Sequence, residues 1–294
     1  CVERQFPGEC FSCQAKCEQS GSHPTTPAAA GGARAAGHCH SEGMRSLQWI
    51  DNDAPLPPTT QALGPGSDAP GLLAAGGSLS PWRLEEAYRH GVFPWFSAGQ
   101  PVLWWSPDPR MVLPVAQFKV SKSLAKTLRR FIRSPACEVR IDSAFDQVIA
   151  ACAQTPRDGQ GGTWIVPPMV AAYRAWHRLG RVHSVETWVD GQLVGGLYCV
   201  AIGRMVFGES MFAWATDASK VALAALVCFC RHHGVSFIDC QQNTGHLASL
   251  GAHDIARSLF EQHLSRSSGE PEIADWTYDL ALWSQIDGLQ GNQG

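Results

Sequence analysis

Three polar residues in the C-terminal third of this chain of 294 residues have the types and the spacing needed for acid–base chemistry. Glu209 comes after one apolar run, and Asp239 and Gln241 close the next one. A carboxylate can hold or deprotonate an amine, and an amide beside it can orient that amine by hydrogen bonding. We therefore take Glu209, Asp239 and Gln241 as the first candidates for chemistry.

The elements that must position these residues follow from the apolar pattern. Three runs separated by short turns predict an antiparallel meander, over residues 183–189, 192–202 and 205–212. A helix over 218–233, with Asp217 as its N-cap, then leads to a strand over 235–241. A last helix covers about 255–263. This order is an α+β layout with helices covering one sheet, and ligands gather at the carboxyl ends of such strands.

Upstream of the meander, aromatic residues are dense in Phe93-Pro94-Trp95-Phe96 and in Trp104-Trp105. One interpretation is a small aromatic core. The other is that one or two indoles face a cleft and stack on a flat ligand, as bases stack on aromatic side chains in single-stranded nucleic-acid sites. The pattern leaves both interpretations open.

A basic helix is predicted over residues 121–133, where apolar residues recur on one face and cations on the other. Because no acidic residue lies in the segment, pairing within the helix cannot explain these cations. They are the best phosphate-contacting candidates in the chain, against the alternative of a solvated helix face. The five cations are Lys122, Lys126, Arg129, Arg130 and Arg133.

The formal net charge of −3 argues against general coating of nucleic acid, so any such contact must come from a local basic patch. The longest apolar runs are too short or too interrupted to span a bilayer, which needs about 20 residues, and no secretory signal opens the chain. We expect a protein of the cytoplasm without membrane contact. The six cysteines from Cys137 to Cys240 lie in apolar surroundings and should be reduced, buried thiols.

Residues 1–43 have the Gly, Ala, Pro and Ser content of a disordered segment, and we expect them to be either upstream sequence or an extension that is not native to the protein. Cys10 and Cys13 together with His38-Cys39-His40 could indicate a zinc knuckle, but no apolar residues follow to pack around one. We expect no metal site. The following residues divide into a small N-terminal domain (44–108) and a larger domain (109–294).

Several motifs occur together in one order and give the chain a specific resemblance. They are Phe93-Pro94-Trp95-Phe96, Trp104 to Arg110, Gly162-Thr163-Trp164-Ile165, His183 to Trp188, Gly208 to Phe212, Ala218-Ser219-Lys220 and Asp239-Cys240-Gln241. Together they resemble the bacterial leucyl/phenylalanyl-tRNA–protein transferase family over roughly residues 49–283. The resemblance implies a small N-terminal domain and a larger domain with the acetyltransferase-like (GNAT) fold.

The resemblance also implies an activity and its partners. Members of the family move Leu or Phe, and less readily Met, from charged tRNA to proteins with an N-terminal Arg or Lys. The product has a destabilising N-terminus that commits the protein to degradation. No cofactor is needed, because the aminoacyl ester is already activated. We expect a monomer whose partners are aminoacyl-tRNA and these acceptor proteins.

Roles for single residues come from the same resemblance. Asp239, Gln241 and Glu209 match the family's catalytic group. Trp95 and Trp164 match the indoles that flank the terminal adenine of the tRNA, and Tyr173 a tyrosine near that end. The basic helix matches the region that holds the acceptor stem. Four residues match the apolar pocket for the amino-acid side chain: Leu197, Met211, Leu223 and Leu226.

Two rival functions belong to other classes. An acyl-CoA-dependent acetyltransferase would share the expected fold, but it needs a glycine-rich loop that leads from a strand into a helix, and the junction over 214–220 has no glycine. A non-catalytic tRNA-binding module would need only the basic helix and the aromatic residues. It would leave Glu209, Asp239 and Gln241 unexplained.

Overall fold

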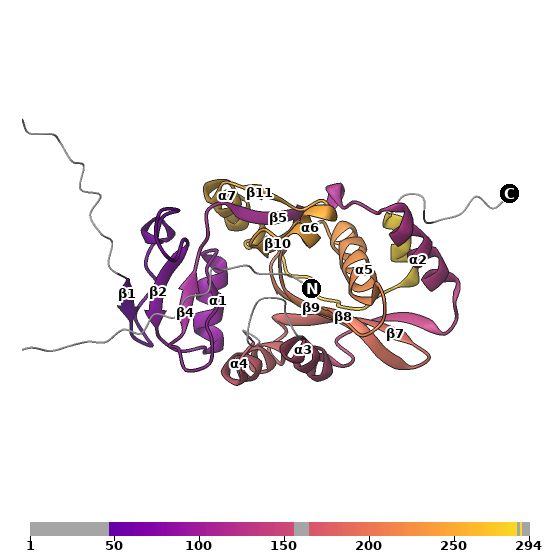
Figure 1. Cartoon of the computed structure of the whole chain (residues 1–294), viewed down its shortest axis with the longest axis horizontal. Coiled ribbons are helices and arrows are strands. Elements are labelled where there is room, and N and C mark those ends of the chain that lie inside the picture. The colour runs from indigo at the N-terminus through magenta and orange to yellow at the C-terminus, as the bar shows by residue number, and fades with distance from the viewer. Residues whose placement is uncertain (1–46, 156–164, 287–288, 290–294) are drawn as a thin grey trace, which may run out of the picture. The chain divides into compact units, whose positions relative to one another are not determined.

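Two β-sheets organise the part of the chain that the computed structural model describes, which is residues 47–155, 165–286 and 289 (Figure 1). The prediction of a mixed α and β fold is confirmed, but the prediction of one sheet was incomplete. The proposed extension over residues 1–43 and the indole of Trp164 lie outside the described residues. The division into domains at residue 108 stays a prediction.

The smaller sheet has four short strands in the order β1-β2-β4-β3. Their bounds are Gln48–Ile50 for β1, Leu72–Gly76 for β2, Phe93–Pro94 for β3 and Leu103–Trp105 for β4. Helix α1 (Pro81–Arg89) follows β2 and precedes β3 in the chain, and the Ser80 hydroxyl caps its start by accepting a hydrogen bond from the backbone of Arg83. It ends before Gly91, whose φ of 72° suits a residue without a side chain.

The larger sheet has seven strands in the order β11-β5-β10-β9-β8-β7-β6. Its strands are β5 (Arg110–Pro114), β6 (Cys137–Ile141), β7 (Val182–Val189), β8 (Gln192–Ile202), β9 (Met205–Ala213), β10 (Phe237–Gln241) and β11 (His253–Ile255). The predicted meander is therefore confirmed as β7-β8-β9. Strand β5 was not predicted, and it lies antiparallel between β10 and β11.

Helices cover both faces of the larger sheet. They are α2 (Lys122–Arg133), α3 (Phe145–Gln154), α4 (Pro167–His177), α5 (Ala218–His232), α6 (Gly245–Ser249) and α7 (Arg257–Ser267). Three short 3₁₀ segments complete the described elements: Thr59–Gln61, Val115–Gln117 and Leu280–Gln285. Within the described residues, none of these helices is long and apolar enough to cross a membrane.

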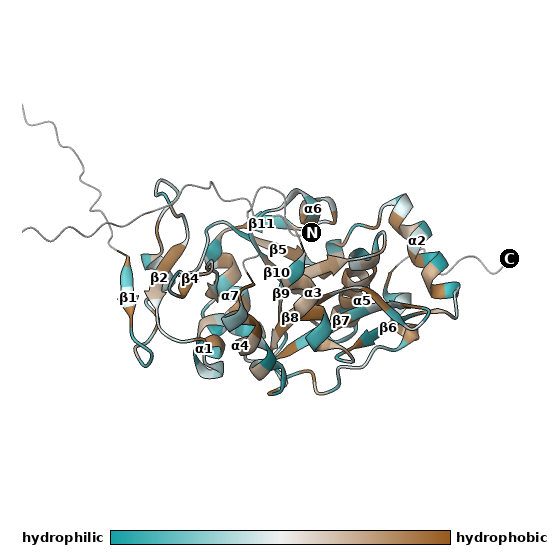
Figure 2. Ribbon diagram, turned by 60° about the horizontal axis from the view of Figure 1, so that its bottom comes forward, coloured by the Kyte–Doolittle hydropathy of each residue, from teal (hydrophilic) through white to brown (hydrophobic). Residues whose placement is uncertain are grey.

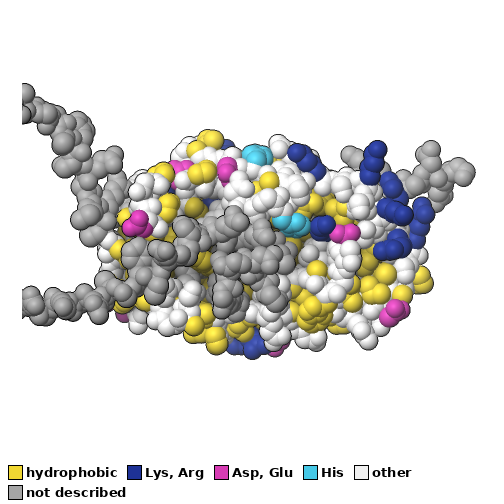
Figure 3. Space-filling model, viewed as in Figure 1, with side chains coloured by type: hydrophobic (Ala, Val, Ile, Leu, Met, Phe, Trp, Pro, Cys, Tyr) yellow, Lys and Arg dark blue, Asp and Glu magenta, His cyan; other side chains and the backbone are white. Residues whose placement is uncertain are grey.

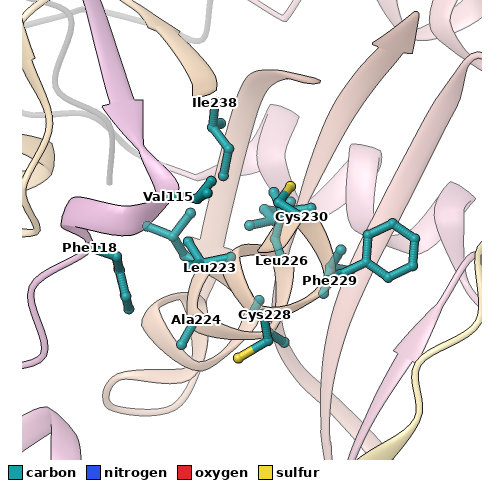
Figure 4. Packing of buried hydrophobic residues seen from close by; sticks show 14 of the residues in the cluster. Val115, Phe118, Leu223, Ala224, Leu226, Cys228, Phe229, Cys230 and Ile238 are labelled. Carbon is teal, nitrogen blue, oxygen red and sulfur yellow. The ribbon is translucent and has the colours of Figure 1, made fainter. Parts of the chain in front are cut away.

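Alternation along β8 shows which helices share a face. Leu197 and Cys199 belong to the apolar cluster around α5, whereas the ring of Tyr198 between them packs edge-on against Phe145 of α3 and Tyr173 of α4. Helix α2 is on the α5 side, since its residues Leu124, Leu128 and Phe131 join the same cluster. Figure 4 shows the centre of this core, and Figure 2 shows the hydrophobic residues along α5 and the strands that it covers.

Strand β9, helix α5 and strand β10 form the crossover that the sequence predicted. Strands β9 and β10 are parallel neighbours, with Ile238 beside Val206 and Asp239 beside Phe207. Gly195 of β8 lets α5 approach closely, because a Cβ there would lie 2.5 Å from the Cβ of Ala218. The predicted side-chain cap by Asp217 is wrong. That residue has a φ of 62°, and its carboxylate accepts hydrogen bonds from Lys220 and Thr127 instead.

The motif from His183 to Trp188 has a structural role that its sequence did not reveal. The buried Glu186 carboxylate accepts hydrogen bonds from the backbone N–H of Ala144, the Ser184 hydroxyl and the Trp188 indole. Ala144 is the residue before α3. Glu186 therefore fixes the start of α3 on the sheet. These hydrogen bonds also satisfy its carboxylate, as burial of a charged group requires.

The cysteines provide a test of this core. Burial raises the pKa of Cys228 to about 12, and it raises the pKa values of Cys199, Cys230 and Cys240 as well. Cys137 is only half-buried. Since the thiolate is the reactive form, we predict that iodoacetamide at pH 8 alkylates Cys137 well before these four in the native protein. Peptide mapping by mass spectrometry checks this. Equal labelling of Cys199 and Cys137 would contradict the buried core.

Candidate functional site

Gln241 joins the two carboxylates that the sequence singled out. Its side-chain amide donates a hydrogen bond to Oε1 of Glu209 over 2.9 Å, and its backbone N–H donates one to Oδ1 of Asp239 over 2.9 Å. All three residues are buried. The structure thus brings Glu209, Asp239 and Gln241 together, as expected for residues on neighbouring strands, although their chemical roles stay predictions.

Irregular strand pairing aims these side chains at one another. In β9, Gly208 pairs with Cys199 and Ser210 with Tyr198, so Glu209 is an extra residue within the strand and not at its end as predicted. In β10, the register with β5 also shifts between Asp239 and Gln241. Gln241 has a φ of 64°, which is unusual for a residue with a side chain. Bulges of this kind redirect side chains and are common beside functional sites.

Asp239 is held by a buried arginine from β5. Nε of Arg110 donates to Oδ1 of Asp239 over 2.8 Å, and Nη2 donates to Oδ2 over 2.7 Å, which is a bidentate ion pair. The third guanidinium nitrogen, Nη1, donates to the carbonyl of Gly91 over 2.9 Å. The ring centroids of Phe93 and Phe260 lie 4.9 and 4.5 Å, respectively, from the guanidinium carbon of Arg110. Asp239 is therefore a fixed, charge-compensated carboxylate.

Glu209 accepts a hydrogen bond from Gln241 and lies within hydrogen-bond distance of two tyrosine hydroxyls. The Tyr88 hydroxyl donates to Oε1 over 2.7 Å, and the Tyr173 hydroxyl lies 2.5 Å from the Tyr88 hydroxyl and 3.5 Å from Oε2. Burial, followed by the nearby charges of Glu209 and Tyr173, raises the pKa of Tyr88 well above its ordinary value of 10.0. The Tyr88 hydroxyl therefore keeps its proton at neutral pH and stays a donor.

The two interpretations of the aromatic residues, a small core or an indole that faces a ligand, apply to different residues. Trp104 is a core residue, fully buried with its indole N–H donating to the carbonyl of Gly76. Trp95 is only half-buried, and its ring meets Trp105 edge-on with centroids 5.3 Å apart. The Trp95 ring is the better placed of these to meet a ligand. Tyr173 is fully buried beside Glu209.

The four predicted pocket residues lie together in the apolar cluster around α5. Leu197 of β8 and Met211 of β9 are directly opposite each other across the two strands. Leu223 and Leu226 are one helical turn apart on α5, and all four are at most 5% exposed. They form one continuous apolar wall on the α5 side of the sheet.

The cations of α2 form a basic surface. Four of these cations are exposed, namely Lys122, Lys126, Arg130 and Arg133, and Arg129 is half-buried. Four of the five cations line a shallow depression of about 520 Å³ together with Ser134: Lys126, Arg129, Arg130 and Arg133. Figure 3 shows dark blue Lys and Arg side chains gathered at the right of the view, where Figure 1 shows α2.

Sequence reasoning missed two residues of this site, Arg110 and Tyr88. Arg110 begins an unpredicted strand, so nothing indicated that it would be buried opposite Asp239. Tyr88 lies in α1, in a part of the sequence where no motif indicated a role for it. The signal that could have found it is its polar end, because a buried tyrosine hydroxyl needs a hydrogen-bond partner.

Comparisons with known proteins agree on one family. The family model described as leucyl/phenylalanyl-tRNA protein transferase matches residues 112–265, and the model of its N-terminal domain matches residues 77–108. A leucyl/phenylalanyl-tRNA–protein transferase of Methylibium petroleiphilum is 65% identical over 81% of this chain and 90% of that protein. One of Leptothrix cholodnii is 62% identical over 82% of this chain and 95% of that protein.

Solved structures add little to this. The chain is similar to a GCN5-related N-acetyltransferase from Kribbella flavida with a TM-score of 0.27 and 12% identity, over 58% of this chain and 60% of that chain. A likeness this low supports no argument, so the acetyltransferase-like fold stays a prediction.

The Arg110–Asp239 pair gives a stability prediction. Arg110→Met leaves the Asp239 charge buried without its partner, so the free energy of unfolding should fall by about 3–5 kcal/mol. Adding Asp239→Leu removes that charge and should recover much of the loss, because an apolar pair of similar volume replaces the ions. Urea denaturation monitored by tryptophan fluorescence measures both. A single variant as stable as the unmodified protein would contradict the burial of this ion pair.

Proposed function

The chain belongs to the leucyl/phenylalanyl-tRNA–protein transferase family and is thus an aminoacyltransferase, and we propose that it moves Leu or Phe, and less readily Met, onto the α-amine of proteins with an N-terminal Arg or Lys. The product would carry a destabilising N-terminus that leads to degradation. The observation that supports this proposal most is the cluster in which Gln241 bridges Glu209 and Asp239.

The proposed reaction needs little more than alignment. The amine attacks the carbonyl carbon of the aminoacyl ester, and the ester bond to the terminal ribose of the tRNA breaks. A free α-amine has a pKa of roughly 7.7–8.0, so an appreciable fraction is neutral near pH 7. A strong base is therefore unnecessary, and the site must mainly orient the amine, accept its proton and stabilise the tetrahedral oxyanion.

The contacts favour different roles for the two carboxylates. Both oxygens of Asp239 already accept from Arg110, and Oδ1 also accepts from the backbone of Gln241. We propose that Asp239 holds Gln241 in its left-handed conformation and acts on the amine through it. The hydrogen bonds described for Glu209 come from neutral donors, namely tyrosine hydroxyls and the Gln241 amide. It is the better candidate to hold and deprotonate the amine.

The other predicted residues fit the remaining parts of the substrate. We propose that Trp95 and Trp164 stack on the terminal adenine, that Tyr173 lies beside its ribose, and that the cations of α2 contact phosphates of the acceptor stem. The aminoacyl side chain would pack at the end of the apolar wall formed by Leu197, Met211, Leu223 and Leu226. The parallel β9-α5-β10 crossover is consistent with an acetyltransferase-like fold for residues 109–294, which belongs to the same proposal.

A transfer assay tests the function directly. We expect labelled Leu from charged tRNA to appear at the N-terminus of a reporter that begins with Arg or Lys, and not on one that begins with Ala. Incubation with labelled acetyl-CoA is the control and should leave the reporter unlabelled. Acetylation without leucylation would favour an acetyltransferase. Binding of tRNA with no transfer at all would favour a non-catalytic binding module.

The basic surface of α2 gives a separate prediction. Replacing Lys126, Arg130 and Arg133 by Gln removes exposed charges, so tRNA affinity should fall while the melting temperature stays nearly unchanged. The slope of log K against log salt should become shallower by roughly 0.7–0.9 for each phosphate that the variant no longer neutralises. Filter binding at several salt concentrations measures both the affinity and the slope.

The matched control for this prediction is Arg178→Gln. Arg178 is an exposed cation directly after α4, and α4 lies on the other face of the sheet from α2. Its removal changes the net charge without touching the basic surface, so the salt slope should stay the same. Equal slopes for the triple variant and the unmodified protein would assign the α2 cations to a solvated helix face.

A further inference from the structure

Three oxygen-bearing side chains from three elements meet in the protein interior: Tyr88 of α1, Tyr173 of α4 and Glu209 of β9. Each is at most 3% exposed. We propose that Tyr88 and Tyr173 form a proton path that carries a proton from Glu209 to the ester oxygen leaving the tRNA. The inference rests on the proposed function and adds Tyr88 as a residue of its mechanism.

The two short contacts of the cluster are made together in one arrangement of the hydroxyl hydrogens, in which Tyr173 does not also donate across its 3.5 Å contact with Oε2 of Glu209. Tyr88 donates its single hydroxyl proton to Oε1 of Glu209 over 2.7 Å. The Tyr88 oxygen must therefore be the acceptor in its 2.5 Å contact with Tyr173, whose hydroxyl is the donor. The result is a directed chain from Tyr173 through Tyr88 to Glu209. Such a chain transmits a proton when every bond reverses.

The reaction supplies a proton at one end of this chain and requires one at the other. When the neutral amine attacks the ester carbon, the nitrogen gains a positive charge and must lose one proton, which Glu209 accepts. When the carbon–oxygen bond to the ribose breaks, the leaving oxygen takes the electron pair and needs a proton, which Tyr173 donates. Tyr88 then passes its proton to Tyr173 and takes one from Glu209. All three side chains return to their starting states, and no other reactant is consumed.

Packing holds the path in place. The Tyr88 ring lies edge-on against Phe207 with centroids 5.0 Å apart, and its centroid lies 5.3 Å from that of Trp176. The Tyr173 ring meets Tyr198 edge-on at 5.7 Å. Gln241 also donates to Oε1 of Glu209, which fixes the carboxylate at the inner end. The Tyr173 hydroxyl lies 2.5 Å from the Tyr88 hydroxyl and 3.5 Å from Oε2 of Glu209, so its nearer partner is the other tyrosine and not the carboxylate.

The test uses single turnovers with the full-length protein in excess over leucyl-tRNA and with a saturating peptide that begins with Arg. Tyr88→Phe and Tyr173→Phe keep the rings and remove one link each. Each rate of peptide-bond formation should fall roughly 10²-fold, the scale of general acid–base assistance. The double variant should be no slower than the slower single variant, because a path already broken once cannot be broken again. Affinity for uncharged tRNA should stay within about twofold.

Tyr198→Phe is the matched control, because Tyr198 is another buried tyrosine that packs on Tyr173 and its hydroxyl makes none of the hydrogen bonds described for Glu209. Its transfer rate should match that of the unmodified protein. Near-normal transfer by either Tyr88→Phe or Tyr173→Phe would overturn the proton path. So would losses that multiply in the double variant, since independent packing defects combine in that way. If Tyr88→Phe failed to fold, Tyr173→Phe alone would carry the rate test. Absence of transfer by the unmodified protein would instead refute the proposed function.

Discussion

The buried ion pair between Arg110 and Asp239 is the interaction on which the candidate site depends. Arg110 begins β5, shortly after the chain leaves the smaller sheet, and its guanidinium contacts the Asp239 carboxylate in the middle of β10 and the carbonyl of Gly91 just after α1. One side chain thus ties three segments that are distant in sequence. Because a buried charge without a partner is costly, each segment has only one low-energy position relative to the others.

Hydrogen bonds connect this ion pair to the other residues of the site. Asp239 accepts from the backbone of Gln241, the side chain of Gln241 donates to Glu209, and Glu209 accepts from Tyr88. Each group is buried, so each bond also prevents the cost of an unsatisfied polar atom. Bulges in β9 and β10 lie at Glu209 and between Asp239 and Gln241, where an extra residue interrupts the regular pairing and changes the local direction of the side chains.

The sequence predicted the parts of this arrangement that local patterns encode. The meander, α5 and β10 follow apolar periodicity and turn residues, and the neighbouring strand ends placed Glu209, Asp239 and Gln241 together. It could not predict that Arg110 faces Asp239, because a pairing between residues 129 positions apart leaves no local signal. Nor could it predict the bulge at Glu209, which depends on the partner strand. The side-chain cap by Asp217 was predicted wrongly, because Asp is common at helix starts but this carboxylate accepts hydrogen bonds from Lys220 and Thr127 instead.

The charge distribution would suit the two proposed substrates, which are opposite in charge. Carboxylates of the site are buried and paired with donors, whereas most cations of α2 are exposed on the α5 side of the sheet. A tRNA approaching α2 from solvent would therefore meet the basic surface before it meets a carboxylate of the site, and screening by salt weakens any longer-range repulsion from the acids. The proposed acceptor, with its N-terminal Arg or Lys, would bring its own positive charge to the buried acids. Separating the charges by depth would let a protein of net negative charge bind tRNA and still retain carboxylates for such an acceptor.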